Sequence, residues 1–597
     1  MGNMGKQRNI LWRIFFMLLV LLLIVVLELG RHTVIGWVLA AVVFAAFYYL
    51  RSNRLKESSL GKRFLSWICL LAVCALVLLI SYPPIKAVPA VEGKNPETTD
   101  VIHLSQGDIS GVYTQDKKVE VYAGIPYAKP PVGELRWKEP QAAESWEGVL
   151  KADHFAPMSM QMLDPPIVDS FKQIFGFHDY RISLSDNYRT AASEDSLYLN
   201  VWRPAEAKAD KLPVLVFIHG GSLQNGQTWY KDYNGEGLAK DGVIVVNMAY
   251  RLGIFGFFAD PELAEESPNH TTGNYGLLDQ ICALQWVRDN IESFGGDPDN
   301  VTIAGESAGS ASVSAICTSP LAKGLFRRVI MESSTVTSPK PSHSFRLLDE
   351  AFDAGEKTKE KYGANSVEEL RALPAEDIVE ELSTHHHIAV DGYALKETPY
   401  ESYKKGEYNE EAQIHGFNRE ESAPFILFEH ADLKNYEEKI RGMFEEPYAS
   451  RVLESFPAAT DNEADENWMN IYSVFYFDYG HYCDARLAAE NNIPSYMYYF
   501  TKDNGRLGTW HTGEIIYFYG NIPPKSSLFT DGDRALSDTI KAYIINFARS
   551  GDPNAEGLEK WKITDGNTVQ EFGTEVKEVE TPYLELYGIM DEMYGFK

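Results

Sequence analysis

Residues 294–309 read Phe-Gly-Gly-Asp-Pro-Asp-Asn-Val-Thr-Ile-Ala-Gly-Glu-Ser-Ala-Gly, so a short apolar run is followed by the pentapeptide Gly-x-Ser-x-Gly. That context predicts a serine on a sharp turn between a strand and a helix. Because the turn crowds the backbone, residues 305 and 309 must be small, and the Ser307 oxygen is left open to a base and to a substrate carbonyl. An ordinary Gly/Ser turn before a helix is the alternative, so the motif needs support from the rest of the chain.

Charge is divided unevenly along the 597 residues. The net charge is -29, with +8 in residues 1–86 and -37 in the remainder. An acidic body of this kind repels polyanions, so we expect no nucleic-acid partner. The five cysteines form no Cys-x-x-Cys pair and predict neither a metal site nor a disulfide framework.

Three apolar runs near the N-terminus predict three transmembrane helices. They are Ile14–Leu27, Val34–Leu50 and Phe64–Ile80, each of 14 to 17 residues, and their flanks extend them to about 10–29, 33–50 and 64–81. A cleaved signal peptide explains only the first run. Buried core helices are a poor alternative, because three such runs follow one another with basic edges.

Basic residues set the predicted orientation of these helices in the lipid. Lys6, Arg8 and Arg13 precede the first run, and a second basic group fills the link between the second and third: Arg51, Arg54, Lys56, Lys62 and Arg63. The positive-inside rule then predicts a cell-membrane protein with its N-terminus in the cytoplasm and everything after Ile80 outside. We expect a membrane segment over 1–86, an exposed proline-rich linker over 87–100 and a catalytic domain over 101–597.

The acidic body alternates strand-like and helix-like stretches, which predicts an α/β fold. Val214–Ile218 and Val243–Val246 are continuous apolar runs, typical of strands buried on both faces of a mostly parallel sheet. Gly276–Phe294 carries a helical apolar stripe that leads into the strand before Ser307. Residues 340–480 are rich in Glu and Lys with helical patterning, and we expect them to form an inserted helical cap.

Several long motifs, in order, resemble the type-B carboxylesterase family, which includes the cholinesterases. They are Tyr122–Ala128, Pro130–Gly133, Leu135–Trp137, Glu194–Trp202, Tyr250–Gly253, Gly273–Gln280, Phe294–Gly309 and Phe547–Asn554. The resemblance spans about 108–595. It implies an α/β-hydrolase fold with a central mostly parallel sheet and helical insertions, here preceded by three transmembrane helices. It also implies a serine carboxylesterase that acts on a small-molecule ester, with no cofactor and no metal.

The resemblance further implies a triad in the chain order serine, acid, histidine. It places the nucleophile at Ser307, the acid at Glu421 and the general base at His511. Glu420 is the nearest alternative for the acid. Ser196 stands where the family often has a disulfide-forming cysteine, which implies that this bridge is absent.

Donors for the oxyanion are expected from the backbone N–H groups of Gly221, Ser222 and Ala308. Many relatives have glycine or alanine where Ser222 stands. A serine keeps the N–H, so the oxyanion hole is expected to survive, with its side chain narrowing the acyl side.

Two alternative functions stay open at this point. Some members of the family have lost the triad and act as adhesion or scaffold proteins, although the intact Ser307, Glu421 and His511 argue against this. The same fold also supports thioesterase, amidase or deacetylase activity. The run His385–His387 does not predict a metal site, because consecutive residues do not easily converge on one ion.

Overall fold

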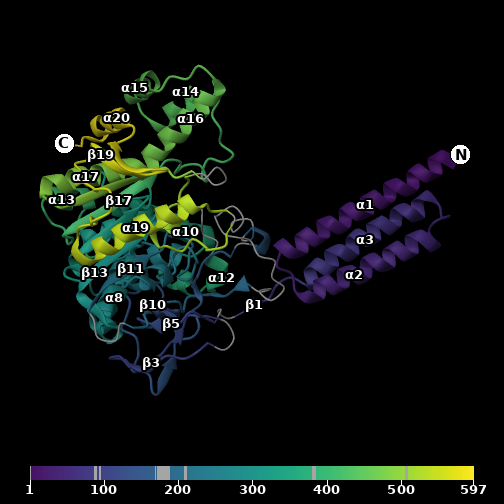
Figure 1. Cartoon of the computed structure of the whole chain (residues 1–597), viewed down its shortest axis with the longest axis horizontal. Coiled ribbons are helices and arrows are strands. Elements are labelled where there is room, and N and C mark those ends of the chain that lie inside the picture. The colour runs from purple at the N-terminus through teal and green to yellow at the C-terminus, as the bar shows by residue number, and fades with distance from the viewer. Residues whose placement is uncertain are drawn as a thin grey trace. The chain divides into compact units, whose positions relative to one another are not determined.

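The computed structural model describes residues 2–86, 90–92, 96–163, 165–168, 170, 189–206, 211–379, 385–503, 509–526 and 528–596, without the side chains of 2–9, 86 and 189 (Figure 1). The chain divides into two compact units. Unit 1 comprises Met1–Val88 and Leu163–Ala191, and unit 2 comprises Pro89–Met162 and Ala192–Lys597. The predicted boundaries at 86 and 100 stay a prediction.

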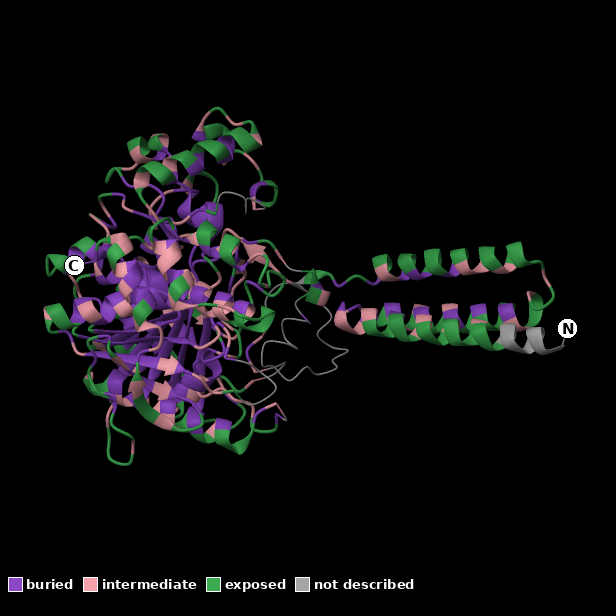
Figure 2. Ribbon diagram, turned by 90° about the horizontal axis from the view of Figure 1, so that it is seen from above, coloured by how far each residue is buried: buried purple, intermediate pink, exposed green. Residues whose placement is uncertain are grey.

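Unit 1 contains the helices α1 (Gly2–Leu29), α2 (Val34–Tyr49) and α3 (Leu60–Ile80), with a π-helical turn, η1 (Leu50–Arg54), after α2. By length and composition, the segments Ile10–Leu29, Val34–Arg54 and Leu60–Ile80 are suited to cross a membrane. Their outward faces are exposed, as Figure 2 shows. Aromatic rings pack between them, with centroids 5.6 Å apart for Phe16 and Phe44 and 4.8 Å apart for Phe47 and Trp67.

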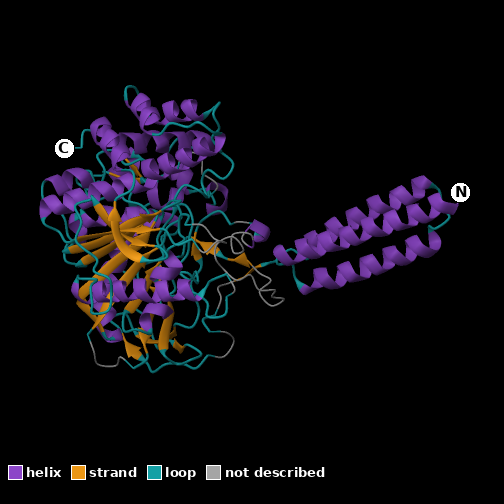
Figure 3. Cartoon of the chain, turned by 45° about the horizontal axis from the view of Figure 1, so that its top comes forward, coloured by secondary structure: helices purple, strands orange, loops and turns teal. Residues whose placement is uncertain are grey.

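Unit 2 is built on a central sheet whose described strands follow the order β20-β19-β18-β17-β14-β13-β11-β12-β10-β5-β4. Their bounds are β4 (Val112–Tyr113), β5 (Val119–Pro126), β10 (Tyr198–Pro204), β11 (Leu212–Ile218), β12 (Ile244–Met248), β13 (Gly296–Glu306), β14 (Arg328–Glu332), β17 (Ala412–Asn418), β18 (Ser495–Phe500), β19 (Thr568–Phe572) and β20 (Val576–Glu580). The strands from β12 to β19 run parallel, and antiparallel pairs flank them. Figure 3 shows this sheet with helices around it. The predicted mostly parallel α/β sheet is confirmed.

The apolar runs of the sequence become the middle of the sheet. All residues of β12 are buried, as are the last six of β11, since helices cover both faces of such parallel strands. The predicted amphipathic stretch forms α8 (Tyr275–Asn290) and the 3-10 turn η3 (Ile291–Phe294), which lead directly into β13.

The prediction of one helical insertion over 340–480 is wrong in its middle. Helices such as α10 (Leu348–Tyr362) and α16 (Asp461–Ser473) do lie there, but β17 interrupts them and pairs with β14 and β18 inside the sheet. All seven residues of β17 are buried. Its sequence, AQIHGFN, mixes polar and apolar residues, so no apolar run signals a buried strand.

Part of the predicted linker pairs with unit 2. The N–H of Val91 donates to the carbonyl of Asp153 at 2.9 Å, and the N–H of Thr99 donates to the carbonyl of Gly111 at 3.0 Å. Both Val91 and Thr99 are buried. These described residues are therefore held against the sheet and are not exposed.

Candidate active site

Ser307 lies on the turn between β13 and α9 (Ala308–Cys317), with φ 55° and ψ -125°. Such backbone angles cost a non-glycine residue on the order of 1–3 kcal/mol, and surrounding contacts must hold them. A Cβ on Gly309 would lie 2.0 Å from the carbonyl oxygen of Ile218, and one on Gly305 would lie 2.5 Å from backbone atoms of Gly309. The predicted need for small residues at 305 and 309 is thus confirmed.

His511 lies between a hydroxyl and a carboxylate. Its Nε2 is 2.8 Å from Ser307 Oγ, and its Nδ1 is 2.6 Å from Glu421 Oε2. Glu421 is fully buried, and its second oxygen accepts the backbone N–H of Asn418 at 2.7 Å. The fold therefore brings together three side chains that are more than 80 residues apart in sequence.

Glu420, the alternative acid, forms its hydrogen bonds with Thr509. Its carboxylate accepts the N–H of Thr509 at 2.8 Å and the Thr509 hydroxyl at 3.1 Å. Arg419 lies 3.5 Å from the same side chain. These contacts hold the loop that carries His511, and it is Glu421 that reaches the imidazole.

Further buried carboxylates surround the imidazole. Glu306 Oε1 lies 3.3 Å from His511 Nε2, and Glu514 accepts hydrogen bonds from Ser333 Oγ at 2.6 Å and from the Asn418 side chain. Burial and neighbouring acids raise the pKa of both Glu306 and Glu514. Burial alone would lower the pKa of His511, but the negative charges of Glu306 and Glu421 outweigh it and raise that pKa. The site therefore favours an imidazolium.

The loop after β11 lies against Ser307. A Cβ on Gly220 would lie 2.7 Å from Glu306 Oε2 and 2.9 Å from Ser307 Cβ. Gly221 has φ 105° and Ser222 has φ 56°, and the N–H groups of Gln224 and Asn225 close the turn on the Gly221 carbonyl. Among the described residues, no acceptor pairs with the N–H of Gly221 or Ser222. Ala308 opens α9, where N–H groups lack intrahelical acceptors.

Two aromatic rings that we did not predict pack on His511. The ring centroids of Phe425 and Phe477 lie 5.2 Å and 4.7 Å from that of His511. Phe425 follows β17 and is 46% exposed, and Phe477 lies in the π-helical turn η5 (Val474–Asp478). Nothing in the sequence marks these two among 30 phenylalanines, because only tertiary structure brings them to the imidazole.

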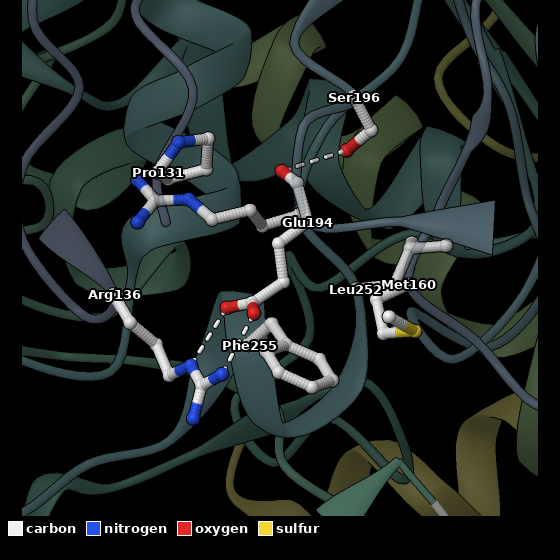
Figure 4. Close-up of a pocket in the computed structure, with 8 residues that line it drawn as sticks. Pro131, Arg136, Met160, Glu194, Ser196, Leu252 and Phe255 are labelled. Carbon is white, nitrogen blue, oxygen red and sulfur yellow. Dashed lines mark hydrogen bonds and ion pairs between the residues drawn. The ribbon is translucent and has the colours of Figure 1, made fainter. Parts of the chain in front are cut away.

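A small cavity elsewhere in unit 2 is structural. Figure 4 shows its lining, in which Arg136 and Glu194 form a bidentate ion pair with two distances of 2.7 Å. Its volume of about 10 Å³ holds about one water molecule. Ser196 also lines it, and all five cysteines of the chain are free.

Comparisons with known proteins show which family the chain belongs to. The model of the carboxylesterase family matches residues 98–585. The chain belongs to the carboxylesterase family. It is 32% identical to carboxylesterase 1C of Rattus norvegicus over 505 residues, which cover 79% of this chain and 89% of that protein.

Other carboxylesterase relatives extend the comparison. The precursor of the medium-chain fatty acyl-CoA hydrolase of Anas platyrhynchos is 32% identical over 519 residues, covering 79% of this chain and 88% of that protein. The crystal structure of the carboxylesterase EST55 of Geobacillus stearothermophilus superposes with a TM-score of 0.69 at 29% identity, covering 82% of this chain and 100% of that one. This carboxylesterase is thus a carboxylic ester hydrolase with an α/β-hydrolase fold, as the sequence predicts.

Proposed function

We propose that the chain is a membrane-anchored serine esterase that works through the triad Ser307, His511 and Glu421. The observation that carries this proposal is the pair of contacts at His511, 2.8 Å to the hydroxyl and 2.6 Å to the carboxylate. A neutral imidazole in this position accepts the hydroxyl proton, and the carboxylate fixes its tautomer.

The proposed reaction begins with acylation. Ser307 Oγ attacks the ester carbonyl carbon while its proton moves to His511 Nε2. The C–O bond to the alcohol breaks as His511 returns the proton to the leaving oxygen. Water attacks the acyl-enzyme in the same way, with His511 again as base, and releases the carboxylic acid. Glu421 and Glu306 stabilise the imidazolium that exists at each tetrahedral stage.

The tetrahedral oxyanion is proposed to bind the N–H groups of Gly221, Ser222 and Ala308. The close approach of Gly220 to Ser307 supports this placement of the loop. Removing one such donor typically lowers turnover by about 10²–10³-fold. The side chain of Ser222 is exposed, so it adds bulk at the edge of the site.

The three apolar helices are proposed to anchor the enzyme, with the N-terminus in the cytoplasm and the catalytic domain outside. Length, composition and the basic residues of the link support this. Expression in a bacterial host with an N-terminal tag tests it. The chain should stay in the membrane pellet after an alkaline carbonate wash, and protease added to spheroplasts should digest the hydrolase domain and spare the tag. Digestion of the tag before the hydrolase domain would contradict the proposed orientation.

Labelling of the full chain in detergent with a fluorophosphonate tests the triad. We expect covalent label on Ser307, none in S307A and full label in S310A, since Ser310 lies one helical turn further and bonds to the Ser334 carbonyl. Absence of label in the folded wild-type protein would favour the adhesion or scaffold alternative.

Thioester hydrolysis is a second candidate, because a relative at 32% identity is named a fatty acyl-CoA hydrolase. Matched oxygen esters and thioesters with the same acyl chain separate the two activities. A higher kcat/KM for the oxygen ester supports the esterase proposal, and the reverse order supports the thioesterase. The same comparison with the matching amide tests amidase and deacetylase activity.

A further inference from the structure

Two histidines and an aspartate meet inside unit 2, apart from the proposed triad. His415 lies on β17, and His481 and Asp484 lie one turn apart on α17 (Tyr479–Asn491). All three are buried, and one possible ligand atom from each lies within 4.8 Å of the other two. The sequence does not predict this cluster, because 66 residues separate the two histidines.

The contacts within the cluster leave polar atoms without partners. His415 Nδ1 lies 3.3 Å from His481 Nδ1, and His415 Nε2 lies 2.8 Å from Ser495 Oγ on β18. Among the residues that the structure describes, none forms a hydrogen bond with His481 Nε2 or Asp484 Oδ2, although both side chains are at most 2% exposed. Buried polar atoms in native proteins are nearly always paired, so the Asp484 oxygen calls for a partner.

Asp484, the third member of the cluster, is buried with the two rings. A buried carboxylate is costly without a nearby positive charge, and none of the contacts given for Asp484 supplies one.

The spacing of the two rings also suits a metal. Zinc binds histidine nitrogen at about 2.0–2.1 Å in a tetrahedron, which places two ligand nitrogens about 3.3–3.4 Å apart. The two Nδ1 atoms lie at 3.3 Å. When His415 Nε2 donates to Ser495 Oγ, its Nδ1 presents the lone pair to His481, and such an outer hydrogen bond commonly orients histidine ligands.

We propose that His415, His481 and Asp484 bind a divalent transition-metal ion of the zinc type, as a structural site. Side-chain rotation of Asp484 brings its carboxylate to the ion, and a water molecule completes the tetrahedron. The ion joins β17 to α17. Because all three side chains are buried, the ion contributes to folding and not to the hydrolytic chemistry.

Metal analysis of the full-length protein in detergent tests the site. The protein is stripped with a chelator, incubated with Zn²⁺, passed through gel filtration and analysed by mass spectrometry of the metal. We expect one bound zinc per chain, and a thermal midpoint roughly 2–4 °C above that of the stripped protein. Co²⁺ should give the visible absorption of a tetrahedral ion with nitrogen and oxygen ligands.

Variants test whether the zinc binds this cluster or other buried histidines of the chain. D484N keeps the shape of the side chain and H481F keeps an aromatic ring, and both should lose stoichiometric zinc and the zinc-dependent rise in midpoint. H386A is the matched control, since His386 is also buried but lies in the run His385–His387, and it should retain zinc. Loss of zinc in H386A but not in H481F would assign the ion to that run. Folded wild-type protein that retains no zinc and shows no shift in midpoint would overturn the proposal and leave a metal-free histidine pair.

Discussion

Glu306 Oε1 lies 3.3 Å from His511 Nε2, the same nitrogen that faces the Ser307 hydroxyl. The carboxylate that precedes the proposed nucleophile in sequence therefore acts on the proposed base in space. Both side chains are buried, so solvent screens their interaction little. This contact has a measurable consequence for the pH dependence of the reaction.

The variant E306Q should shift the acidic limb of the kcat/KM profile to lower pH. The active form of His511 is neutral, so activity rises as pH increases through its pKa. Glu306 raises that pKa, and its removal lowers it, by roughly 1 unit for a charge at this distance. Profiles of wild type and E306Q at one ionic strength measure the shift. An unchanged acidic limb would show that Glu306 does not act on the base.

The variant E421Q should lose far more activity than E420Q. An amide at 421 cannot stabilise the imidazolium, and the tautomer of His511 is no longer fixed, which in a comparable triad costs about 10⁴-fold in turnover. Glu420 contacts Thr509 instead, so E420Q should lose less than about 10-fold. Steady-state kinetics of the two neighbouring variants provide the comparison, and equal losses would reject the assignment of Glu421.

The variant G220A should lower turnover by about 10²-fold or more, because its methyl group displaces the loop that carries the proposed oxyanion donors. The matched control is G442A, since a Cβ on Gly442, in the helix α14 (Tyr436–Met443), meets nothing within 4 Å. It should keep full activity. If G220A retains wild-type turnover, the loop does not hold the oxyanion.

The variant F425A should reduce kcat/KM for esters with long acyl chains or aryl groups by about 10-fold, and much less for acetate esters, because it removes apolar surface beside His511. F428A is the control. Phe428 is 91% exposed, and among the ring contacts given for the described residues none joins it to His511. An equal loss for all substrates in F425A would indicate a role in holding the imidazole rather than in binding substrate.

The elbow at Ser307 is predictable because local sequence determines it. The apolar run of β13 and the glycines at 305 and 309 specify a strand, a sharp turn and a close approach of backbones, whatever the rest of the chain does. The central strands β11 and β12 are predictable for the same reason, since continuous apolar runs mark them.

The features that the sequence does not predict depend on contacts between elements far apart in the chain. β17 was missed because Gln413, His415 and Asn418 are buried polar residues whose partners lie on other elements: Ser495, His481 and Glu514. Phe425 and Phe477 were missed for a similar reason, since their role comes from the position of His511. A polar strand and an aromatic pair carry no local signal.

β17 also determines which segments of this enzyme can vary in sequence. The strand is held between parallel neighbours, and three residues beyond it lies the carboxylate that reaches His511. The rings that pack on His511 lie instead on the segment after the strand and in η5. Natural drift or laboratory selection for new esters can therefore alter these two segments while the strand, and with it the alignment of Glu421 and His511, stays constant.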